Sequence, residues 1–230
     1  MKKCNLPTHK ECLAIIEEHH VPLHIVKHSL TVAKLAVFLA KRLKEKGIEL
    51  DVNLVDRACL LHDIVRICNI KELDYSKFEQ PVTAEDKAKW QQLRARYEGI
   101  PHEHAAYDIL KEKYPALALT IKKHRYIGIL DEEEKPNTWE EKLVYYADMR
   151  VMHEEIVPLE ERLTEAHKRN VHFYSTEAQR RIIIAKVDPL IYSLEKEIFD
   201  RIDLNPHQIT DEFIDSFPVT DNRFNRRGIE

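Results

Sequence analysis

The stretch KHSLTVAKLAVFLAKRLKEK, residues 27–46, decides the fold because its apolar side chains recur at the spacing of one helix face. Val32, Leu35 and Leu39 lie three and four residues apart, while the lysines of the stretch fall on other faces. His28 precedes Val32 by four residues, so it points with the apolar side chains. This pattern predicts a long amphipathic helix that carries one histidine into a hydrophobic core.

Helix signals continue along the chain, whereas the signals of β-hairpins are scarce. Only 4 of the 230 residues are glycine, so turns of the Asn-Gly or Asp-Gly kind cannot be common. Thr-x-x-Glu capping boxes begin helices at Thr8 and Thr138, and Gly47 ends the long helix in the usual position. The predicted helices cover about residues 8–20, 22–46, 53–66, 83–97, 102–113, 115–125 and 138–153, a charged helix that begins at Pro158, and 176–202.

The predicted architecture is an all-α bundle that forms a single domain over residues 1–230. Its core spans about residues 22–155, and a helical extension follows over residues 156–230. Pro189 is expected to kink the last long helix, whose isoleucines and leucines give it a broad apolar face. This face must be buried in the core or in a homodimer contact, so the extension could be a lid, a dimer surface or additional core.

Composition and charge exclude several classes of protein. The 36 basic and 40 acidic residues give a net charge of −4, which provides no electrostatic footprint for nucleic acid or an anionic membrane. No apolar run approaches the ~18 residues of a membrane span, and the N-terminus lacks the apolar stretch of a secretory signal. The four cysteines form no CxxC pair, which indicates reduced thiols. We therefore expect a cytoplasmic protein with neither a membrane nor a nucleic acid as partner.

Histidine and aspartate side chains fall on the apolar faces of the predicted helices. His62 shares a helix face with Val55, and Asp63 follows it directly. Asp148 lies among large apolar residues, where a lone carboxylate costs several kcal/mol unless a cation compensates it. That partner could be Arg150 or a tyrosine hydroxyl, but histidines that point into the same core favour a metal ion.

Two more histidines repeat the inward pattern. His102 shares a face with Ala106, and His124 shares one with Ile121. His104 lies on the side of Asp108 and is the weaker candidate for a metal ligand, although either His102 or His104 could be that ligand. Imidazoles and carboxylates without thiolates suit Fe, Mn, Zn or Ni and argue against a closed structural zinc site. The remaining histidines are expected to be solvated or to cap helices: His19, His20, His24, His153, His167, His172 and His207.

Taken together, these segments resemble the HD-domain superfamily of metal-dependent phosphohydrolases. The resemblance covers about residues 22–155 and rests on KHSLTVAKLAVFLA (27–40), LLHDIV (60–65), PHEHAAYDIL (101–110), IKKHRY (121–126) and YYADMRVMH (145–153). The superfamily pattern H…HD…D falls on His28, the pair His62-Asp63, and Asp148, which implies that these four bind one metal ion. Members with two ions add further histidines, which His102 and His124 resemble.

The resemblance implies hydrolysis of a phosphate ester or anhydride, of a small phosphorylated substrate such as a nucleotide, by metal-activated water. One or two divalent ions are expected, from among Fe, Mn, Ni, Co, Zn and Mg, and Asp63 could bridge two of them. Many relatives read HDIG followed by Lys, whereas here Arg66 ends the run and could bind phosphate through two parallel hydrogen bonds. Asp63 and Arg66 are therefore the catalytic candidates.

Lys123 and Arg125 are further candidates for contacts to a substrate phosphate, although such a basic run is usually a solvated face. No Gly-Tyr-Pro follows the later histidines, which argues against a cyclic-di-GMP phosphodiesterase. Three alternatives stay open. The scaffold could release nucleoside monophosphates, cleave dinucleoside polyphosphates or hydrolyse a guanosine alarmone. It could instead be a regulatory module that binds a nucleotide without catalysis, or a di-iron oxygenase.

Overall fold

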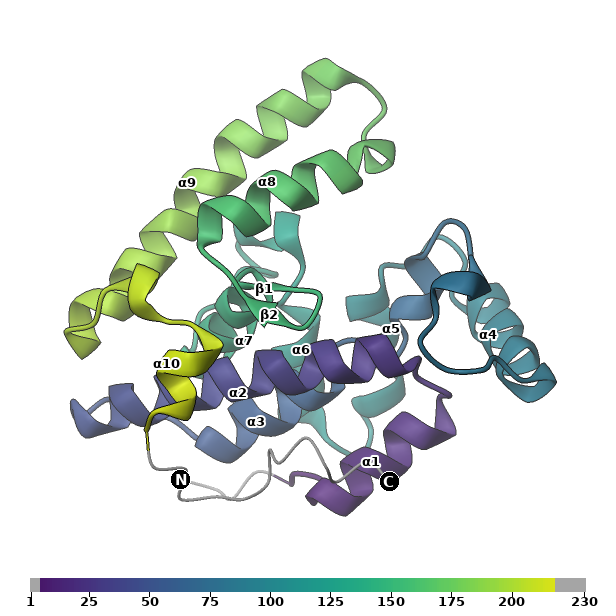
Figure 1. Ribbon diagram of the computed structural model, residues 1–230, viewed down its shortest axis with the longest axis horizontal. Coiled ribbons are helices and arrows are strands. Elements are labelled where there is room, and N and C mark those ends of the chain that lie inside the picture. The colour runs from purple at the N-terminus through teal and green to yellow at the C-terminus, as the bar shows by residue number, and fades with distance from the viewer. Residues whose placement is uncertain (1–4, 218–230) are drawn as a thin grey trace.

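The central element of the computed structural model, which describes residues 5–217, is the long helix α2 (Leu23–Glu45). It packs against α3 (Val52–Leu61) and α7 (Trp139–Asp148), and Figure 1 shows it crossing the middle of the molecule. Val32, Leu35 and Leu39 are fully buried, as their helical spacing predicts. The all-α class and the helical bundle with a C-terminal extension are therefore confirmed.

Around this centre lie the other helices, several of which begin at local capping boxes. Thr8, Thr83 and Thr138 each form a capping box, so the predicted starts of three helices are confirmed. The remaining α-helices are α1 (His9–Glu18), α4 (Ala84–Arg96), α5 (His102–Leu110), α6 (Pro115–Lys122), α8 (Leu159–Arg169), α9 (Glu177–Ile202) and α10 (Asp211–Asp215). The 3₁₀ turns are η1 (Arg66–Asn69), η2 (Tyr75–Lys77), η3 (Tyr126–Leu130), η4 (Val171–Phe173) and η5 (Pro206–Gln208).

Helix ends differ more from the prediction. The helix predicted to reach residue 66 ends at Leu61, and the one predicted to reach residue 125 ends at Lys122. The helix predicted to reach residue 153 ends at Asp148, and a hairpin of β1 (Val151–Met152) and β2 (Glu155–Ile156) follows. His153 forms the turn of this hairpin with a φ of 56°, a left-handed conformation that cannot continue an α-helix.

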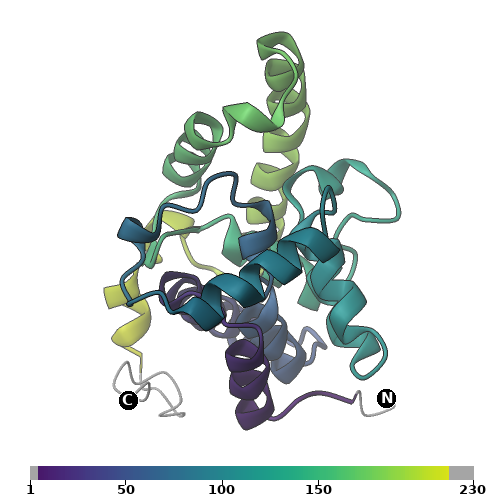
Figure 2. The same ribbon diagram turned by 90° about the vertical axis from the view of Figure 1, so that its right-hand side faces the viewer.

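The extension begins with α8 and α9, which form an arm that stands out from the body of the molecule (Figures 1 and 2). Residues on the C-terminal half of α9, such as Ile191 and Ile198, are fully buried, whereas Ile182 near its start is 57% exposed. The apolar face is thus divided between core packing and an exposed segment. The helix continues through Pro189 without interruption.

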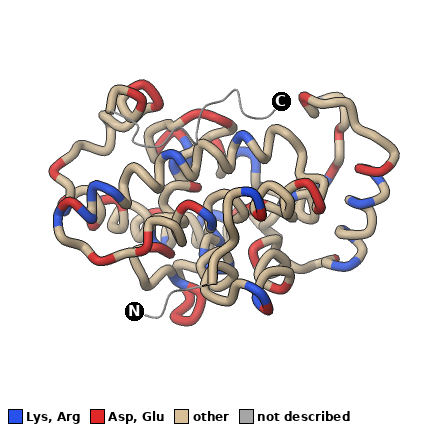
Figure 3. Tube along the Cα trace, turned by 90° about the horizontal axis from the view of Figure 1, so that it is seen from below, with Lys and Arg blue, Asp and Glu red and all other residues tan. Residues whose placement is uncertain are grey.

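Three features concern the expected partners and compartment of the protein: the apolar helix α2, the distribution of charge and the cysteines. Among the described residues, α2 is long and apolar enough to cross a bilayer by length and composition, but 67% of its most apolar window is buried inside the protein. Such burial is expected of the core helix of a globular bundle. Figure 3 shows Lys and Arg interspersed with Asp and Glu along the chain. Cys12, Cys59 and Cys68 are free thiols, and Cys4 lies outside the described residues.

Candidate metal centre

Six side chains from five segments of the chain converge at one end of α3. Their imidazole and carboxylate atoms form three overlapping groups in which every ligand atom lies within 4.8 Å of the others. The groups are His28, His62 and Asp63; His62, His124 and Asp148; and Asp63, His102 and His124. The structure therefore brings together all six residues that the sequence offered as metal ligands.

Asp63 stands in the middle of this cluster, with its two carboxylate oxygens facing different histidines. Its Oδ2 lies 3.7 Å from Nε2 of His62, whereas its Oδ1 lies 2.9 Å from Nε2 of His102. The same Oδ1 is 3.9 Å from Nε2 of His124. Asp148 completes the side of His62, because its Oδ1 lies 3.6 Å from that ring and 3.0 Å from Nε2 of His28. This arrangement suits one ion, or two ions that share Asp63.

The four imidazole rings share one orientation, with Nε2 towards the centre and Nδ1 facing away from it. A carbonyl oxygen only accepts hydrogen bonds, so in a neutral ring the nitrogen that faces it carries the proton and Nε2 keeps its lone pair. The Nδ1 contacts are His28 to the backbone oxygen of His153 (2.9 Å), His62 to that of Cys59 (2.7 Å), His124 to that of Ile121 (2.6 Å), and His102 to Oδ1 of Asn69 (2.9 Å). Such outer hydrogen bonds orient metal-binding histidines in general.

Asn69 is the only side chain among these four acceptors, and its own orientation is fixed. Its Oδ1 also accepts a hydrogen bond from the backbone N–H of His102 at 2.6 Å, and its Nδ2 donates to the carbonyl of Ile100 at 3.1 Å. Pro101 offers no side-chain cap to α5, so Asn69 acts as that cap from another segment. The sequence did not single out Asn69, because this contact joins residues that are 33 positions apart.

The electrostatics of the cluster favour a bound cation. Burial opposes ionisation of Asp63 and Asp148, but the facing histidines outweigh it and hold the pKa of both carboxyls well below the usual range. Burial alone would lower the pKa of His62, yet the charge of Asp63 raises it to about 9. Burial lowers the pKa of His124 to about 4. Nε2 of His62 is buried without a well-formed hydrogen bond in residues 5–217, so a metal ion could take the place of the proton that the raised pKa keeps there.

The cluster opens onto a cavity of about 600 Å³. Asp63, Asp148 and His28 form part of its wall, together with Arg66 and Asn69. A volume of this size lies within the range of about 300–1,000 Å³ that small-molecule sites occupy. The candidate ligands are therefore reachable by a small substrate.

Some predicted site residues lie elsewhere. Lys123 is buried and its ammonium group donates to Glu141 at 3.1 Å, while a guanidinium nitrogen of Arg125 lies 3.5 Å from Glu134. Neither residue lines the cavity, because each is held by a carboxylate outside it. His104 also faces Glu134, at 2.8 Å, so the choice between His102 and His104 falls on His102.

Several other side chains have surroundings that differ from those the sequence suggested. Arg150 is not the partner of Asp148, because its guanidinium group binds Tyr146 and backbone carbonyls of the extension. His24 lines the cavity and its Nδ1 is buried without a hydrogen-bond partner among the residues that the structure describes, although the sequence placed this residue in a solvated stretch. His153 and His172 also line the cavity. They lie in the turn of the hairpin and in η4, so only the folded chain shows where they point.

Comparison with known proteins defines the class. The chain matches the family model described as HD domain over residues 25–152, more than half of its length, and therefore belongs to the HD-domain family. This membership implies the superfamily of metal-dependent phosphohydrolases, whose members bind divalent metal ions.

The chain is also similar to two individual proteins, both at low sequence identity. The chain is 30% identical over 158 residues to an uncharacterized protein of Methanocaldococcus jannaschii, covering 64% of this chain and 77% of that protein. It is 26% identical over 167 residues to a tRNA (cytidine(56)-2'-O)-methyltransferase of Picrophilus torridus, covering 73% of this chain. It spans only 43% of the length of that methyltransferase. No solved structure matches the chain.

Proposed function

We propose that this protein hydrolyses a phosphate ester or anhydride of a nucleotide, with one or two divalent metal ions bound by His28, His62, Asp63, His102, His124 and Asp148. The observation that carries the proposal is the set of four inward Nε2 atoms and two carboxylates beside a cavity of about 600 Å³. A bound divalent ion would lower the pKa of a water molecule and polarise the phosphate. Fe, Mn, Co, Ni, Zn and Mg are all candidates for this ligand set.

Arg66 is the residue we assign to the substrate phosphate. One of its guanidinium nitrogens, Nη1, lies 3.1 Å from Nδ1 of His102, which also lies 2.9 Å from Oδ1 of Asn69. A guanidinium group has several N–H donors, so this one contact leaves others available to a ligand in the cavity that Arg66 lines. A planar guanidinium group matches phosphate oxygens through two parallel hydrogen bonds.

The walls of the cavity support a nucleotide as the substrate. Phe78 and Phe173 both line it, and Phe173 is 56% exposed. Aromatic rings of this kind offer apolar faces on which a nucleobase can stack. The cavity therefore combines surfaces for a base with cations for phosphate.

Turnover of a nucleotide panel and a chromogenic phosphodiester, assayed separately with Mn, Fe, Co, Ni and Mg, tests the proposal. Replacing Asp63 with Ala should abolish both metal retention and turnover, since this carboxylate faces both sides of the cluster. Asp200→Ala is the matched control, because the side chain of Asp200 is 59% exposed and pairs only with Lys196 in the described chain. An Asp63→Ala protein with unchanged metal content and full activity would disprove the ligand assignment.

The same panel separates the alternatives. Tight nucleotide binding without turnover in any metal would favour a regulatory module that binds without catalysis. A product that forms only in the presence of oxygen would favour an oxygenase.

A further inference from the structure

A second group of cations lines the cavity, and it comes from the extension. Helix α8 follows the matched HD domain in the chain and stands beside α9 in the projecting arm (Figure 2). Arg162 and Arg169, at the middle and end of α8, both belong to the cavity wall that also includes Asp63 and Asp148. The extension therefore completes a cavity whose other wall holds the candidate metal ligands.

Arg162 is nine-tenths buried and has an unused donor. Its Nε donates to the backbone oxygen of Val151 at 2.7 Å, which fixes the side chain against the hairpin. Its Nη1 is buried and makes no hydrogen bond within residues 5–217, since Oε2 of Glu165 lies 3.6 Å away, close enough for an ion pair but too far for a hydrogen bond. A buried charged donor without a hydrogen bond is costly, so such a group indicates a ligand that supplies the missing acceptor.

Two guanidinium groups meet a single carboxylate at this place. Glu165 faces both arginines, with its Oε1 3.1 Å from Nε of Arg169, so one carboxylate is shared between two guanidinium groups. Burial, and then the charge of Arg162, lowers the pKa of Arg169, whereas the charge of Glu165 raises it. Arg162 and Arg169 thus repel each other, and an anion between them would supply a second negative charge.

We propose that Arg162 and Arg169 form a second phosphate site, and that the preferred substrate carries a second phosphate group besides the one hydrolysed at the metal centre. This inference rests on the proposed function. The planar guanidinium groups offer several donors in the geometry that phosphate oxygens accept, whereas the fixed position of Arg162 defines where the second phosphate binds. The extension would then determine specificity, and the HD core would perform the chemistry.

The test compares three probes: adenosine 5′-monophosphate, adenosine 5′-diphosphate and adenosine 3′,5′-bisphosphate. Calorimetry gives their affinities, and turnover with Mn²⁺ is measured in parallel. The wild-type protein should prefer at least one doubly phosphorylated probe over the monophosphate. Arg169→Met should reduce this preference about tenfold, the usual worth of a charge-assisted hydrogen bond. Arg162→Lys keeps the charge but loses the planar group and should reduce the preference as well.

Lys168→Met is the matched control, since Lys168 is exposed on the same helix turn and does not line the cavity. It removes the same charge and should leave the preference unchanged. The half-exposed position of Arg169 allows its replacement without unfolding, which a melting curve verifies.

The two proposals fail in different ways. A wild-type protein that shows no preference for a second phosphate, or a preference that Arg169→Met and Lys168→Met change equally, would overturn the second site even if the monophosphate is hydrolysed. Absence of turnover with a preference that depends on Arg169 would overturn the hydrolase and retain the site.

Discussion

His62 and His124, two of the candidate metal ligands, point inward through the same local arrangement. His62 directly follows the last residue of α3, and His124 lies two residues after the last residue of α6. Each donates from Nδ1 to the carbonyl oxygen three positions earlier, on Cys59 and Ile121. Carbonyl groups in the last turn of a helix lack partners within the helix, so they are available to accept the imidazole proton. The helix end thus holds Nδ1 protonated and directs Nε2 to the centre.

A pH dependence of metal binding follows for His62. Its pKa of about 9 means that both ring nitrogens carry a proton in the metal-free protein at neutral pH, whereas a metal-binding imidazole must be neutral. Binding of Mn²⁺ must therefore displace this proton, and the apparent affinity should rise with pH, by up to about tenfold per unit below pH 9. His124, with a pKa of about 4, is already neutral and should contribute no proton.

Calorimetry in two buffers of different ionisation enthalpy counts the protons released near neutral pH. We expect about one proton from His62 for each ion bound at its side of the cluster. An affinity for Mn²⁺ that stays constant between mildly acidic and mildly alkaline pH would contradict this assignment.

At the scale of elements, the starts of helices could be predicted and their ends could not. A capping box such as that of Thr8 lies within four residues, so the sequence contains the whole signal. The ends of α3 and α7 depend instead on tertiary contacts. One example is the hydrogen bond from Nδ1 of His28 to the backbone oxygen of His153 in the hairpin after α7. Asn69 and His24 were missed for the same reason, because their roles depend on segments distant in the chain.

The hairpin of β1 and β2 acts on the site through its backbone. The carbonyl of His153 accepts the Nδ1 proton of His28, and this carbonyl is placed by a φ of 56°. His153→Pro would force φ to about −65° and move the carbonyl, so metal affinity should fall about 10- to 100-fold. His153→Gly permits the same backbone conformation and should retain the metal. Elemental analysis after dialysis against a weak chelator measures both variants, and equal metal content would show that the hairpin does not orient His28.

At the scale of the whole molecule, the candidate metal ligands come from the matched domain alone, whereas the cavity is lined by both that domain and the extension. The six candidate ligands lie between residues 28 and 148, where the matched domain lies, and the inward periodicity of the helices predicted their convergence. The part of the cavity wall from α8 could not be predicted, because no sequence pattern shows where an extension folds back. A cavity lined by both parts requires that the HD core and the extension keep fixed positions relative to each other.

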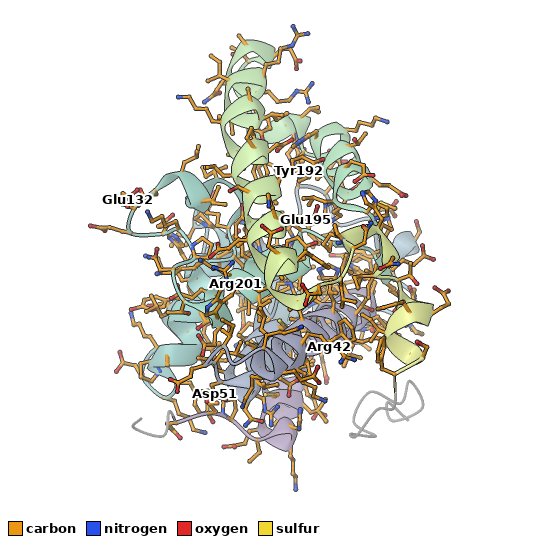
Figure 4. The ribbon with its side chains drawn as sticks, turned by 90° about the vertical axis from the view of Figure 1, so that its left-hand side faces the viewer. Arg42, Asp51, Glu132, Tyr192, Glu195 and Arg201 are labelled. Carbon is orange, nitrogen blue, oxygen red and sulfur yellow. The ribbon has the colours of Figure 1, made fainter. Side chains whose placement is uncertain are left out.

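Arg150 is one of the residues that join them. It is 1% exposed, and its guanidinium group donates to the hydroxyl of Tyr146 and to the carbonyls of Pro206 and Ile209. It also lies 3.3 Å from Glu195, which Figure 4 labels on α9. Removing one partner of a buried ion pair leaves the other charge uncompensated, at a cost of about 3–5 kcal/mol.

We therefore expect Arg150→Met to lower the free energy of unfolding by about 3–5 kcal/mol, because it leaves these acceptors without a donor. Arg201→Met, at an exposed position labelled in Figure 4, removes one positive charge from α9. It should lower the free energy of unfolding by about 1 kcal/mol or less. Urea unfolding, followed by circular dichroism and by fluorescence of Trp90 and Trp139, measures both. The two signals should change together, since a core and an extension joined by Arg150 unfold as one unit. Two separate transitions in the wild-type protein would show that the extension folds independently of the HD core and that Arg150 does not join them.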